Sequence, residues 1–163
     1  MKEIIFILAL LCMKAAFPQT PKLQDGIYRV AAVIKQQNVQ PNGHQAVVHF
    51  NSGFLENAPD SATGLLIDAG NFVPLELEKE PLLMDHADKK KTLQLTFSRV
   101  AADQLQRFTE RNLMKQASLI VNGEALTAHK IRAVITGGKL EISRCDDNAC
   151  ERMYVYLKEK VKH

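Results

Sequence analysis

The sequence predicts an α+β fold, in which an antiparallel sheet is covered by two helices. Short runs alternate apolar and polar residues, an Asn122-Gly123 pair separates two such runs, and two later segments place apolar residues at helical spacing. The chain has 163 residues, of which 46% are hydrophobic, so it is long enough to bury one substantial core. We therefore expect one domain or two small lobes.

The N-terminus has the pattern of a signal peptide. A basic residue precedes an apolar segment, Ile4–Cys12, that is too short to span a bilayer as a helix. We expect residues 1–19 to be the signal, with the cut between Ala15 and Thr20, and the protein to be periplasmic or secreted in a bacterium. The rival interpretation is a lipoprotein, which would be tethered to the membrane at Cys12.

The N-terminal lobe, residues 20–85, is expected to be rich in β-strands. Four runs have strand character: Ile27–Lys35, His44–Phe50, Gly64–Ala69 and Phe72–Leu77. A Pro-Asn-Gly sequence at residues 41–43 separates the first two runs, so we expect these strands to pair antiparallel. Pro74 cannot donate a backbone hydrogen bond, which places the fourth strand at a sheet edge. The charged segment that follows marks the boundary between the lobes.

The C-terminal lobe, residues 86–163, is expected to follow the order β-α-β-β-β-α. A strand at Leu93–Phe97 comes first, and Ser98 after it can cap a helix over residues 99–113. The apolar residues of this helix recur near helical spacing: Val100, Ala101, Leu105, Phe108 and Leu113. We expect this apolar stripe to pack on a sheet.

The segment Lys115–Gly138 predicts a β-hairpin. Its two apolar runs flank Asn122-Gly123, a pair that tolerates the positive φ angles of a two-residue type I′ turn. Gly137-Gly138 ends the hairpin and a strand at Lys139–Ser143 follows. Asp147 or Asn148 is expected to cap a last helix with this apolar face: Met153, Tyr154, Leu157 and Val161.

Two cysteines remain once the signal is removed. Four residues separate Cys145 from Cys150, and in an oxidising compartment so close a pair favours a disulfide. Free thiols are the main alternative. A metal site is disfavoured because the pair has no second ligand pair near it, and a redox role is disfavoured because the two-residue spacing of thioredoxin-like motifs is missing.

The sequence argues against several function classes. The formal net charge of +3 is spread through the chain, so nothing resembles the basic stripe of a nucleic-acid-binding protein. No nucleophile–base pair or metal-ligand cluster is visible, and the glycines of Thr136–Lys139 lead into a strand rather than a helix, unlike a phosphate loop. We therefore expect no catalytic residues, no cofactor and no metal. The rival hypothesis is a hydrolase or transferase that uses Asp68, His86 or His129 in a cleft between the lobes.

Residues 92–157 resemble the head subdomain of the first large periplasmic domain of SecD and SecDF, the translocon accessory proteins. The resemblance rests on a connected series of segments: LQLTF, AADQLQRFTERN, ASLIVNGEALTA and IRAVITGGKLEIS. The second segment ends in the family's Thr-x-x-Asn, here Thr109–Asn112, and Lys115 matches the lysine that follows. The chain departs from the family at Met114, where glycine is common, at His129, where the family has a proline, and in its cysteine pair.

The resemblance implies a non-enzymatic exported module with a protein partner in the bacterial envelope, with a link to protein export. Translocase activity is not implied, because SecD performs it with membrane-spanning helices that follow this domain. An inhibitor or immunity protein for a partner enzyme is the alternative. Partner contacts are expected on the free sheet face or the exposed hairpin edge, and the candidate residues are Lys115, Asn122, Gly123, Glu124 and His129.

Overall fold

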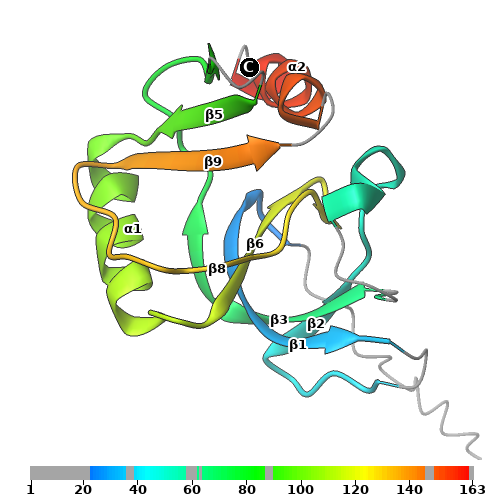
Figure 1. Cartoon of the computed structure of the whole chain (residues 1–163). Coiled ribbons are helices and arrows are strands. Elements are labelled where there is room, and N and C mark those ends of the chain that lie inside the picture. Colours follow the sequence, from blue (N-terminus) through cyan, green and yellow to red (C-terminus); the bar gives the residue numbers. More distant parts are fainter. Residues whose placement is uncertain are drawn as a thin grey trace, which may run out of the picture.

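The computed structural model describes residues 23–35, 39–57, 62, 64–86, 90–145 and 149–161. Its elements are β1 Gly26–Ile34, β2 Gln45–Val48, the 3-10 helix η1 Ser52–Asn57, β3 Gly64–Pro74, β4 Leu82–Asp85, β5 Lys91–Thr96, α1 Arg99–Arg111, β6 Gln116–Val121, β7 Glu124–Ala125, β8 His129–Lys130, β9 Lys139–Cys145 and α2 Ala149–Val161. The predicted signal peptide, Cys12 and the predicted caps Asp147 and Asn148 lie outside the described residues. The α+β class with antiparallel sheets and two helices is confirmed (Figure 1).

The larger sheet has the strand order β2-β3-β1-β6-β7, and β8 also pairs with β6. The predicted pairing of the first two strands is wrong, because β3 lies between them: Ala46 of β2 pairs with Ile67 of β3, and Ile67 pairs with Val30 of β1. The first four residues of β3 are all buried. Such an unbroken apolar run favours an interior position in a sheet over an edge.

The third and fourth predicted strands form one continuous strand, β3. Tyr28 of β1 pairs with Phe72, whereas the next residue, Arg29, pairs with Asp68, so the residues between Asp68 and Phe72 bulge out of the ladder. The bulge lets the strand continue past Gly70. Pro74 pairs with Gly26 at the end of β3, beyond the part of β3 that pairs with β2, which is an edge position of the kind that proline requires.

The larger sheet closes on itself. Ala125 of β7 forms a parallel bridge with Phe50, two residues after β2. The Ala125 N–H donates to the His49 carbonyl at 2.9 Å, and the Asn51 N–H donates to the Ala125 carbonyl at 3.0 Å. Buried side chains fill the inside of this closed sheet: Tyr28, Val30, Ala46, Val48, Phe50, Leu65, Ile67, Ile120 and Ala125.

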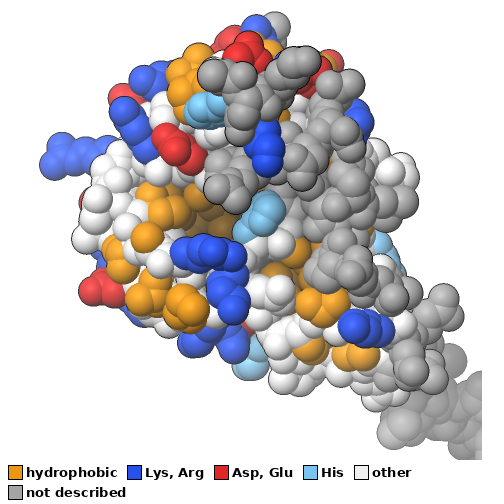
Figure 2. Space-filling view, viewed as in Figure 1, with side chains coloured by type: hydrophobic (Ala, Val, Ile, Leu, Met, Phe, Trp, Pro, Cys, Tyr) orange, Lys and Arg blue, Asp and Glu red, His pale blue; other side chains and the backbone are white. Residues whose placement is uncertain are grey.

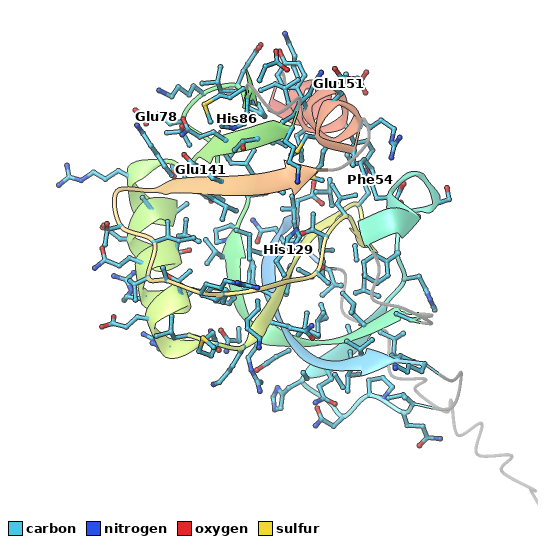
Figure 3. The ribbon with its side chains drawn as sticks, viewed as in Figure 1. Phe54, Glu78, His86, His129, Glu141 and Glu151 are labelled. Atoms are coloured by element: carbon cyan, nitrogen blue, oxygen red, sulfur yellow. The ribbon has the colours of Figure 1, made fainter. Side chains whose placement is uncertain are left out.

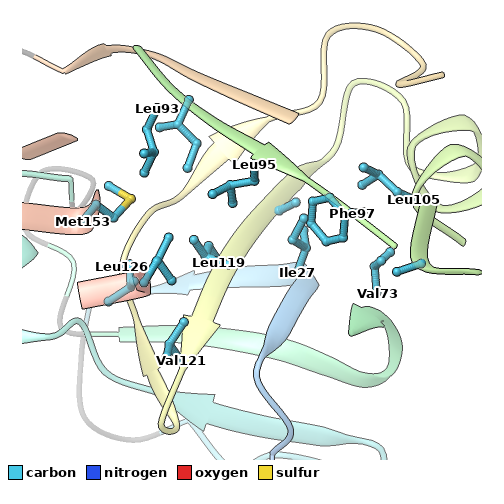
Figure 4. Packing of buried hydrophobic residues seen from close by; sticks show 14 of the residues in the cluster. Ile27, Val73, Leu93, Leu95, Phe97, Leu105, Leu119, Val121, Leu126 and Met153 are labelled. Carbon is cyan, nitrogen blue, oxygen red and sulfur yellow. The ribbon is translucent and has the colours of Figure 1, made fainter. Parts of the chain in front are cut away.

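The smaller sheet has the order β4-β5-β9, and α2 packs against it. The strands of the C-terminal half are thus shared between two sheets, and the larger sheet joins strands from both sides of the predicted boundary at residue 85. The main core lies between the two sheets and the helices (Figures 1 and 4). Its members include Ile27, Leu93, Leu95, Leu105, Leu119, Ile142, Met153 and Leu157.

Helix α1 begins where the sequence predicts. The Ser98 side chain accepts a hydrogen bond from the Ala101 N–H at 3.3 Å, which confirms it as the N-cap. The buried stripe is narrower than predicted, because Val100 is 64% exposed and Leu113, beyond the end of the helix, is 43% exposed. Buried Asn112 ends the helix and donates from its side chain to the Phe108 carbonyl at 2.9 Å. Within the described ranges, neither helix has the length and apolar character needed to cross a bilayer.

The predicted hairpin turn is confirmed, but its second strand is short. Asn122 and Gly123 have φ angles of 55° and 78°, as a type I′ turn requires. The ladder from β7 to β8 is interrupted where the Thr127 hydroxyl, rather than a backbone carbonyl, accepts from the Leu119 N–H at 3.4 Å. After β8 the chain leaves the sheet and reaches β9 through Gly137-Gly138. We call residues 131–138 the connecting segment.

Candidate binding site beside strand β9

A cavity of about 560 Å³ opens between β9 and the start of the connecting segment. One wall is formed by Leu140, Glu141 and Ile142 of β9, and the opposite wall by residues 129–133. Figure 2 shows the opening as a hollow with hydrophobic side chains inside it. The floor belongs to the main core and is formed by Ile27, Leu105, Phe108, Ala117 and Leu119. An occupant of this cavity would therefore contact apolar core side chains directly.

The cavity wall at β9 includes an unpaired strand edge. The Phe97 N–H, just after β5, donates to the Gly138 carbonyl, just before β9, at 2.9 Å. The carbonyl of the preceding residue, Thr96, points away from β9 and accepts from the Glu78 N–H at 2.9 Å. Backbone groups alternate in direction along an antiparallel pair, so Lys139 and Glu141 point their N–H and C=O groups away from β5. Among the described residues, no backbone group bonds to these outward groups.

The rim of the opposite wall carries positive charge, because Lys130 and Arg132 alternate with Ile131, whose side chain packs against the main core. Lys130 and Arg132 line the cavity, are exposed, and form no ion pair within the described part of the chain. Figure 2 shows Lys and Arg side chains along the lower edge of the hollow. The Glu141 carboxylate on the β9 side accepts from the Gln94 side-chain amide at 3.1 Å. Leu140 and Ile142 on either side of Glu141 face the core, so the Glu141 side chain points to the other face of the smaller sheet.

His129 lies at the edge of the cavity and is the one predicted partner-binding residue that lines it. Part of its side chain is exposed, but protein atoms crowd the ring, and this desolvation lowers the pKa of His129 from its ordinary value of about 6.5. The imidazole is therefore neutral at pH 7. The positive charge of this wall comes from Lys130 and Arg132.

The predicted residues at the hairpin turn bond to neighbouring elements. The Asn122 N–H donates to the Asp25 carboxylate at 2.7 Å, and its side-chain amide donates to the Tyr156 hydroxyl at 2.8 Å. The Glu124 carboxylate accepts from the Asn51 side chain at 2.6 Å. Beside the turn, both backbone groups of Ala125 are paired with the segment after β2, so this part of the hairpin edge is not free. Gly123 lies within the turn.

The last predicted contact residue, Lys115, donates from Nζ to the Arg111 carbonyl at 3.4 Å. Partner binding by Lys115 and the turn residues stays a prediction. The disulfide between Cys145 and Cys150 also stays a prediction, because the side chain of Cys145 is outside the part that the structure describes.

The three residues of the hydrolase hypothesis lie in different places. Asp68 forms an ion pair with Arg29 at 3.5 Å, and the His86 ring is 2.8 Å from the Thr92 hydroxyl. Asp68 of β3 and His129 of β8 lie at the same level along the strands of the larger sheet. Strands β1 and β6 separate them, which corresponds to a distance of about 14 Å between their backbones. Figure 3 shows His86 near β5 and His129 below β9. In the described ranges, no three His, Cys, Asp or Glu residues gather closely enough to bind a metal.

The comparisons with known proteins give one kind of match. No family model and no curated protein matches the sequence. The structure is similar to a SecDF structure described as a membrane component that enhances protein export, with a TM-score of 0.47 and 16% identity over 84% of this chain and 63% of that one. It is also similar to SecDF in a super-membrane-facing form, with a TM-score of 0.43 and 20% identity over 79% of this chain and 18% of that one.

A third similar structure is SecDF of Thermus thermophilus, described as a translocon-associated membrane protein, with a TM-score of 0.47 and 11% identity. This match covers 86% of this chain and 30% of that one. The chain thus spans less than two thirds of each SecDF chain. All three structures are of SecDF, the family whose head subdomain residues 92–157 resemble in sequence.

Proposed function

We propose that the protein is a non-enzymatic binding module of the bacterial envelope, which holds an extended polypeptide segment beside β9. The observation that carries the proposal is the position of the apolar cavity directly next to an unpaired strand edge. An extended segment that pairs with β9 gains backbone hydrogen bonds, and its alternate side chains enter the cavity. The geometry therefore supports a polypeptide ligand for this site.

Two further observations support the proposal. The outward backbone groups of Lys139 and Glu141 lie on a strand whose neighbours Leu140 and Ile142 face the core, so a bound strand would place side chains on that same inner side. The separation of Asp68 from His129 supports a role in binding rather than catalysis. The location in the envelope and a role in export remain part of the proposal, on the strength of the predicted signal and the sequence resemblance of residues 92–157.

The test is a binding titration of the full chain with a fluorescein-labelled ten-residue peptide, in which valine alternates with threonine. A second peptide has every amide N-methylated, so it cannot donate along either edge. We expect binding of the first peptide and at least tenfold weaker binding of the second, because a strand added to β9 depends on backbone hydrogen bonds. Equal affinities for the two peptides would show that no strand is added.

A matched pair of variants locates the binding. Ala133→Trp places a large side chain at the cavity, and Ala32→Trp places the same side chain at an exposed position on β1 that does not line it. We expect the first variant to lose peptide binding and the second to bind like the unmodified chain. Binding that survives Ala133→Trp unchanged would mean that the peptide occupies another surface.

A further inference from the structure

The charge of the cavity wall indicates what kind of segment binds there. We propose that the bound segment carries a carboxylate, which lies against Lys130 and Arg132 while the apolar side chains of the segment fill the cavity. The carboxylate belongs either to an aspartate or glutamate of the segment or to its C-terminus. This inference rests on the proposed function, because it describes the occupant of the same cavity.

The first argument is that these two charges have no partner in the described ranges. Lys130 and Arg132 flank Ile131, whose side chain packs against the main core and whose N–H donates to the Lys115 carbonyl at 2.9 Å. The backbone at Ile131 is therefore fixed, and it holds the two cations on either side of one anchored residue. Two cations held at one wall attract an anion more strongly than two cations on mobile loops, because less conformational entropy is lost.

The second argument is that the acidic residue at the opening forms no ion pair with either cation. Of the described residues that line the cavity, only Glu141 is acidic, and its carboxylate bonds to Gln94 on the outer face of the smaller sheet. His129 beside the cations is neutral at pH 7, because desolvation lowers its pKa. An apolar segment without an anion would leave both cations without an ion-pair partner at the edge of the contact. A segment with a carboxylate complements the wall.

The experiment measures the affinity of the full chain for four labelled ten-residue peptides of alternating valine and threonine. The peptides combine one aspartate or one asparagine at the position before the last with a free or an amidated C-terminus. The protein variants are Lys130→Gln with Arg132→Gln, and a control, Lys35→Gln with Lys79→Gln, that removes the same charge at exposed positions outside the cavity.

We expect the peptides with a carboxylate to bind about tenfold more tightly than the amidated asparagine peptide, as two partly exposed ion pairs allow. The double variant at the cavity should lose this preference but still bind the amidated asparagine peptide, and the control should keep the preference. A preference for the free C-terminus alone, or for aspartate alone, identifies the source of the carboxylate.

Two results would overturn the inference, and they differ for the proposed function. Equal binding of all four peptides by the unmodified chain would refute the role of the carboxylate but would not contradict the proposed binding function. Failure of every peptide to bind would refute both proposals. Dodecanoate serves as a separate probe, since it offers a carboxylate on an acyl chain; tight binding of dodecanoate without binding of any peptide would show that the cavity holds an anionic lipid instead.

Discussion

Replacing Gly138 with alanine tests how closely α1 approaches the start of β9. Gly138 has a φ of 68°, and a Cβ added there would lie 2.5 Å from the Cβ of Ala102 in α1. Its neighbour Gly137 has a φ of 74°, but a Cβ added there would have no heavy atom within 4 Å. The two positions therefore share the backbone strain of an alanine at positive φ, and only Gly138 adds a clash.

The magnitudes follow from these two contributions. Alanine in the left-handed region costs about 1–2 kcal/mol, so Gly137→Ala should lower the free energy of unfolding by about that amount. Overpacking adds about 1–3 kcal/mol, so Gly138→Ala should lower it by about 2–5 kcal/mol. Ala102→Gly removes the closest atom and leaves contacts of 3.4 Å and 3.6 Å, which are ordinary. The double variant should therefore be destabilised less than the sum of the two single variants, by about 1–3 kcal/mol.

The assay is urea denaturation of the full chain, followed by far-UV circular dichroism, for the unmodified protein and the four variants. The slope of the free energy against urea should stay constant, so that midpoints compare stabilities directly. Equal destabilisation by Gly137→Ala and Gly138→Ala would refute the close contact between α1 and Gly138. Strict additivity of Ala102→Gly with Gly138→Ala would refute it as well.

Asn112→Ala should lower the free energy of unfolding by about 1–3 kcal/mol, because the buried amide donates to α1 and to the Asn71 side chain at 3.2 Å; a thermal melt that is unchanged would contradict this. The pKa of His129 is lower in the folded chain than in the unfolded chain. As pH falls below about 6.5, the unfolded chain is therefore protonated first, and the free energy of unfolding decreases. His129→Gln should reduce the loss of urea midpoint between pH 7.5 and 5.5, and an equal loss in both proteins would refute this. The Glu141 amide should exchange with deuterium faster than the Ile142 amide, since only the second faces β5; similar protection of both by NMR would show that the β9 edge is covered.

The elements that the sequence predicted correctly are set by local chemistry. Asn122-Gly123 forms the expected turn because only residues that tolerate positive φ fit there, and Ser98 caps α1 because its hydroxyl accepts a first-turn amide. Val100 was placed in the buried stripe because it is apolar. It lies about 100° around the helix from Ala101, outside the stripe that Ala101 and Leu105 form.

The features that could not be predicted depend on contacts between distant residues. Nothing in the neighbourhood of Phe50 or Ala125 indicates that they pair, yet this bridge closes the larger sheet. The cavity likewise brings together Ile27, Phe108 and Ile142, which belong to three separate elements. The sequence shows that Lys130 and Arg132 are charged, but it does not show that they lie opposite β9 across a cavity.

The position of β1 has a consequence for how the chain acquires its structure during synthesis. Among the described residues this strand comes first in the chain, yet one of its two neighbours is β6, and the pairing of Gly26 with Ile120 joins residues about 90 positions apart. Until β6 has emerged from the ribosome, the nascent chain displays an unpaired edge of β1 next to apolar side chains. The contact between β1 and β6 is therefore one that the chain can form only late in its synthesis, and non-local contacts of this kind slow folding in general.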